Sequence, residues 1–201
     1  MQAILDAHDR RDHEASLHPF LRLAGQVPSP GATAEARKEL GFFALALGDA
    51  LDILDRRFGD PVWEVLGLRA RALAWRFRPE DPLDAGAHAF ESAAEDLRDA
   101  AFLVMGHASV AADAVEALAV LAALDSLARH LDAALPLASG RALPEGGLTP
   151  SVRLVLEAQR IDPQDRERAL RAVHAVFDAC QRLLDHLFRT VRENLWMEQG
   201  A

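Results

Sequence analysis

The chain has 201 residues, 50% of them hydrophobic, and its 31 acidic and 22 basic side chains give a net charge of −9. This length is enough for one hydrophobic core, so we predict a single domain over residues 1–201. The acidic balance disfavours nucleic acid and anionic membranes as partners, because phosphate contacts need a basic surface.

Two features of the sequence favour a cytoplasmic protein. The single cysteine, Cys180, cannot form an internal disulfide, and acidic residues near the N-terminus precede any apolar core of a signal peptide. The longest weakly charged stretch, 100–112, is shorter than the roughly 18–20 apolar residues that a membrane span needs.

Helix starts are marked by proline at the first helical position after a capping Asp or Thr, at Asp60-Pro61, Asp81-Pro82, Thr149-Pro150 and Asp162-Pro163. Apolar spacing then predicts helices over 2–17, with an irregular continuation past Pro19, and over 34–58, 61–78, 82–105, 110–135, 150–160 and 163–197. No segment alternates with a period of two. We therefore predict an all-α fold, an up-and-down helical bundle of four to five long helices plus one or two short ones.

The first helix carries three histidines in the stretch HDRRDHEASLH, residues 8–18. His8, His13 and His18 are about 140° apart around a helix, so they cannot share one metal ion. We predict that replacing His8 and His18 together by alanine changes the stability of the protein little. Asp9 and His13 fall in the same arc as the apolar Leu5 and Leu17, which predicts a buried Asp–His pair at the core edge.

Two short stretches resemble known helical families. LHPFL, 17–21, resembles the first helix of heme-oxygenase-like and thiaminase-like enzymes, and ILDAHDRRDH, 4–13, is similar to the start of hemerythrin-like and DinB-like metal bundles. The resemblance implies an alternative function, a metal-dependent bundle enzyme with a carboxylate and histidine centre. Its transition metal, such as iron, would be held by residues among Asp9, His13, His88, Glu91 and Glu95. The His-x-x-x-His pair of the hemerythrin and DinB patterns does not occur in this chain.

The predicted helices 61–78 and 82–105 carry opposite charges. His88, Glu91 and Glu95 form one stripe, and apolar residues lie opposite, so we expect this stripe to face away from the core. Arg69 and Arg76 on the preceding helix are suitable ion-pair partners for it. The alternative is a sensor for a small anionic ligand, with Arg69, Trp75 and Arg76 lining its pocket.

The last predicted helix has the clearest apolar face. Cys180 lies at its centre, so we predict a packed, unreactive thiol. His174 and Asp178 fall on the opposite side. The predicted buried stripe is Val173, Phe177, Cys180, Leu184, Leu187 and Val191.

The sequence contains no nucleophile motif, phosphate loop or metal motif, which favours a non-enzymatic helical interaction or regulatory module. Phe102, Leu103 and Trp196 lie outside the predicted core faces, and exposed aromatic clusters mark interfaces. We therefore expect a homodimer, or else a helical protein partner.

Overall fold

The computed structural model describes residues 2–26, 31, 33, 34, 36, 49, 52–59, 106, 111, 114–134 and 161–199. Four helices are delimited within this part: α1 (Gln2–Ser16), α2 (Pro19–Gln26), α7 (Ala114–Ala134) and α9 (Pro163–Gln199). No strand occurs among the described residues, which confirms the all-α class. The predicted helices 61–78, 82–105 and 150–160 lie outside them.

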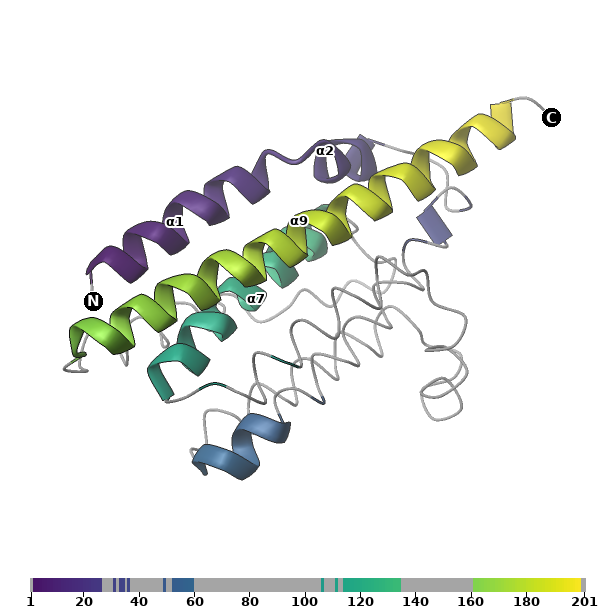
Figure 1. The fold of residues 1–201 in the computed structure, drawn as a ribbon. Helices are drawn as coiled ribbons and strands as arrows, with labels where there is room; N and C mark the ends of the chain where they lie inside the picture. The colour runs from purple at the N-terminus through teal and green to yellow at the C-terminus, as the bar shows by residue number, and fades with distance from the viewer. Residues whose placement is uncertain are drawn as a thin grey trace.

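The described helices pack around α9, which is 37 residues long and therefore about 55 Å from end to end. It contacts α1, α2 and α7, and α1 and α2 follow each other along its side (Figure 1). His8 of α1 contacts Ser126 of α7, and Asp12, one turn later, contacts His130, which also lies one turn later in α7. In the same way, Arg11 contacts Asp178 of α9, and His18, later in the chain, contacts Asp185, which is later in α9. Helix α1 therefore runs parallel to both α7 and α9.

Helix α9 begins where the sequence predicts. Asp162 Oδ1 accepts hydrogen bonds from the backbone N–H groups of Gln164, at 2.7 Å, and Asp165, at 2.9 Å. Pro163 occupies the first helical position, where its missing N–H costs nothing. The predicted apolar face is confirmed in full. Its buried residues are Ala169, Ala172, Val173, Val176, Phe177, Ala179, Cys180, Leu183, Leu184, Leu187 and Val191.

The predicted face of α1 is wrong at Asp9, His13 and Leu17, which are exposed, whereas Leu5 is buried as predicted. His8 and His18 are both buried, each 4% exposed, whereas His13 is exposed. Leu17 lies in the turn between α1 and α2, not in the helix, and it is 49% exposed. The observed buried face of α1 is formed by two aliphatic side chains, two alanines and one histidine. Its residues are Ile4, Leu5, Ala7, His8 and Ala15.

The helix predicted over 34–58 ends as expected at Phe58, although only part of it is described. Gly59 follows with a positive φ of 62°, and its N–H donates to the carbonyl of Asp55 at 2.7 Å. This left-handed conformation after the last helical turn is a common C-terminal cap, and glycine adopts it without a Cβ clash. Arg57 also donates to the carbonyl of Ala111, at 2.7 Å.

Candidate functional site

A polar cluster lies where α1 packs on α7, and two of its members, His8 and Ser126, are buried. We call it the histidine cluster. Asp12 accepts a hydrogen bond from Nε2 of His130 at 2.7 Å, and Arg129 donates to Oγ of Ser126 at 2.9 Å. Nε2 of His8 lies 3.4 Å from the same Ser126 oxygen. The cluster consists of His8, Asp12, Ser126, Arg129 and His130.

The charge of Asp12 is stabilised by this cluster. Burial of the carboxyl raises its pKa, but hydrogen bonds from His130 and Ser126 and the charges of His130 and His8 outweigh burial. The net effect lowers the pKa of Asp12 from 3.8 to about 2. The histidine cluster therefore joins α1 to α7 through an ionised carboxylate.

The contacts of His8 follow the order of a serine, histidine and carboxylate triad. Its Nδ1 lies 3.2 Å from Oδ1 of Asp9, and its Nε2 faces Ser126. However, Ser126 is 0% exposed, and its hydroxyl already bonds Asp12 and Arg129. A nucleophile must reach its substrate, so this geometry makes Ser126 a structural hydrogen-bonding group.

His18 joins α2 to α9. Its Nδ1 accepts the backbone N–H of Phe20 at 3.1 Å, so the imidazole caps the N-terminus of α2 next to Pro19. Nε2 then donates to Oδ1 of Asp185, 3.0 Å away. Phe20 itself is fully buried, which fixes the first turn of α2 against the core.

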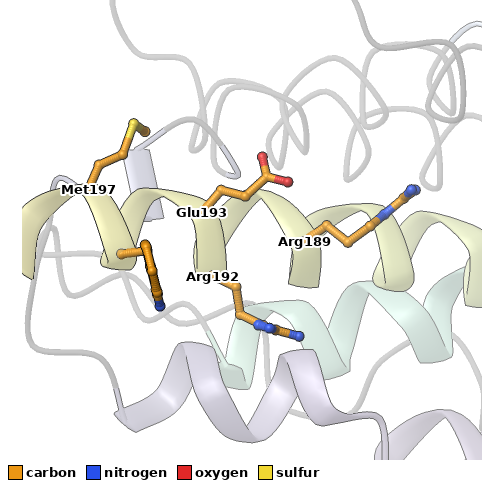
Figure 2. Close-up of a pocket in the computed structure, with 5 residues that line it drawn as sticks. Arg189, Arg192, Glu193 and Met197 are labelled. Carbon is orange, nitrogen blue, oxygen red and sulfur yellow. The ribbon is translucent and has the colours of Figure 1, made fainter. Parts of the chain in front are cut away.

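The last turns of α9 carry an exposed surface with two large apolar side chains. Trp196 is 83% exposed and Met197 is 66% exposed. They line a pocket of about 580 Å³ together with charged residues one and two turns earlier (Figure 2). We call this surface the C-terminal patch. It consists of Arg189, Arg192, Glu193, Trp196 and Met197.

The C-terminal patch combines apolar surface with both signs of charge. In the view of Figure 2, the side chains of Arg189, Glu193 and Met197 extend upward from α9, and that of Arg192 extends downward. The guanidinium of Arg192 lies 5.6 Å from the ring centre of Phe188, an arrangement that holds this cation over an aromatic face. The patch can therefore bind a surface that offers an apolar side chain and complementary charges.

The structure does not bring the predicted metal ligands of α1 together. His13 is exposed, and Asp9 is half-exposed beside His8. Among the described residues, no three His, Cys, Asp or Glu side chains are placed to hold a metal ion. His88, Glu91 and Glu95 lie outside the described residues, as do the anion-pocket candidates Arg69, Trp75 and Arg76.

Sequence reasoning missed the histidine cluster because its members come from segments more than 100 residues apart. One signal was present: Ile4, Ala7 and Ala15 share a helix face with His8. Counting alanine as a core residue would have indicated that face. Trp196 was identified from the sequence, and its exposure is confirmed.

Within the part of the chain that the structure describes, no helix is both long and apolar enough to cross a membrane. Comparison with known proteins finds no matching family model, no matching curated protein and no matching solved structure.

Proposed function

We propose that the protein is a non-enzymatic helical interaction module that associates with a second copy of itself through the C-terminal patch. The observation that carries this proposal is the exposure of Trp196, 83%, beside that of Met197, 66%. Tryptophan is among the residues that contribute most to protein interfaces, because it buries a large apolar area at a small entropic cost.

The composition of the C-terminal patch favours another copy of this chain as its partner. A two-fold interface brings the same surface together twice, so that surface must complement itself. The patch contains two arginines and one glutamate around its apolar side chains. The patch therefore contributes both signs of charge to a larger two-fold surface, whose residues outside the patch supply the opposite charges on the second copy.

The buried polar groups support a structural role for the rest of the described helices. Ser126 and His8 are buried and contact each other, and Asp12 bonds His130 across the α1–α7 interface. These contacts hold α1 and α7 together and support α9, which presents the patch.

Sedimentation velocity over a range of protein concentrations tests this proposal. We expect the wild type to dimerise at micromolar concentration and Trp196→Ala to weaken the dimer by about 30-fold, as loss of an interface hot spot of about 2 kcal/mol would. Leu17→Ala is the matched control, because Leu17 is an exposed apolar residue on the α1–α2 turn. A wild type that stays monomeric at high micromolar concentration, or a Trp196→Ala variant that dimerises normally, would contradict the proposal.

A further inference from the structure

Helix α9 carries an exposed stripe along its whole length. Its members recur three or four residues apart and fall within an arc of about 80° on the helix surface. All of them are exposed in the structure, and the last three turns of the stripe run into the C-terminal patch. The stripe consists of Glu167, Arg171, His174, Asp178, Arg182, Asp185, Arg189, Arg192 and Trp196.

The charges of the α9 stripe complement themselves when a second stripe is laid against it in the opposite direction. With the two-fold axis midway between Arg182 and Asp185, each of these residues faces its opposite charge on the second copy. In the same register, Asp178 faces the second copy's Arg189. Toward the ends, Arg171 faces the second copy's Trp196, a cation and an aromatic ring that attract each other.

We propose that two copies of the chain pair through antiparallel α9 stripes in this register. The inference rests on the proposed self-association and specifies its geometry. In this dimer, the Trp196 side chain of each copy is buried at one end of the interface. Arg182 and Asp185 lie at the centre, where an interface excludes water best.

Other arrangements of the two stripes bring like charges together. In a parallel pair, Arg182 meets the second copy's Arg182. A shift of about one helical turn in one direction places Arg182 against the second copy's Arg189, and a shift in the other direction places Asp178 against Asp185. Like charges in contact across an interface disfavour these arrangements, so the charge order selects one register.

The contacts of Asp178 and Asp185 within one chain are compatible with this pairing. Asp178 binds Arg11, and Asp185 binds His18 through Oδ1. The two carboxylate side chains nevertheless remain 57% and 58% exposed. A carboxylate has about four acceptor positions, so each can accept a second cation from the other copy.

Charge reversal at the centre of the stripe tests the register. Arg182→Asp places two aspartates against each other at both symmetry-related positions, and we expect the dimer dissociation constant to rise about tenfold or more. The double variant Arg182→Asp/Asp185→Arg restores both opposite-charge pairs, and its dissociation constant should return to within about threefold of the wild type. Mixing Arg182→Asp with Asp185→Arg should likewise yield a heterodimer.

The control for charge alone is Arg166→Asp, which makes the same reversal on an exposed residue of α9 away from the stripe. Circular dichroism melting checks that each variant folds. If Asp185→Arg does not fold, the pair formed by Asp178 and the second copy's Arg189 is tested instead. Arg189→Asp should then weaken the dimer, and the double variant Asp178→Arg/Arg189→Asp should restore it.

The outcomes separate the two proposals. A monomeric wild type overturns self-association and this register with it. A wild-type dimer that Trp196→Ala weakens, but that neither double variant restores, leaves self-association standing and overturns the antiparallel register. Restoration by the double variants, with Arg166→Asp unchanged, is the result expected from the proposed pairing.

Discussion

The buried faces of α1 and α9 show how differently two parallel, touching helices can be built. The buried face of α9 is apolar and has Cys180 at its centre. That of α1 is made of a few apolar residues around His8, with the half-buried Arg11 and Asp12 beside it. Apolar periodicity therefore located the face of α9 and misplaced that of α1. A polar side chain can occupy a buried face if partners on other helices satisfy it.

The polar residues His8 and Arg11 of α1 also contact particular side chains of α9. His8 stacks edge-on against Phe177 at 5.7 Å, and Arg11 lies over the same ring, 5.9 Å from its centre. Arg11 also binds Asp178. Such directional contacts specify the position of α1 along α9 more narrowly than aliphatic packing does.

The largest expected effect concerns Cys180. The thiol is 1% exposed, and burial raises its pKa to about 12, so almost none of it is thiolate at neutral pH. Since the thiolate is the reactive form, we expect alkylation of the native protein to be slower than that of the unfolded chain by a factor on the order of 10³ or more. Thiol labelling with and without denaturant measures this ratio. Equally fast labelling in both states would show that the apolar face of α9 opens readily.

The next prediction compares His8 with His13. His8→Ala removes a buried ring from Phe177 and Ser126, so it should lower the free energy of unfolding by about 1–3 kcal/mol. His13→Ala alters an exposed side chain on the same helix and should change the free energy of unfolding by less than about 0.5 kcal/mol. Urea denaturation of both variants makes the comparison. The opposite ranking would support the face of α1 that the apolar pattern predicts.

The smallest expected effect is the pH dependence contributed by Asp12. Its pKa is about 2 in the folded chain and 3.8 in the reference state, so its stabilising contribution is present above about pH 4 and is lost as pH falls through 2. The full contribution is about 2 kcal/mol. Asp12→Asn should therefore be less stable than the wild type at pH 5, and this difference should shrink toward pH 2.

Asp6→Asn is the control for this titration, because Asp6 is an exposed carboxylate on the same helix. Denaturant unfolding at several pH values measures all three proteins. A stability difference between the wild type and Asp12→Asn that stays constant from pH 5 to pH 2 would show that Asp12 does not stabilise the fold through its charge.

The helical class, the start of α9 at Asp162-Pro163 and the buried face of α9 could all be predicted from the sequence. Each depends on local signals: a capping side chain, a proline at the first helical position and aliphatic residues every three or four positions. The exposure of Trp196 followed from the same periodicity, because this residue lies outside the apolar stripe.

The burial of particular polar residues of α1, in contrast, depends on the packing of helices that are distant in the sequence. His8 is buried near Ser126, Asp12 is bonded to His130, and His18 is bonded to Asp185, and each of these partners lies more than 100 residues away in the chain. A polar side chain can be buried where distant groups satisfy its hydrogen bonds, and the spacing of residues along one helix carries no record of those groups.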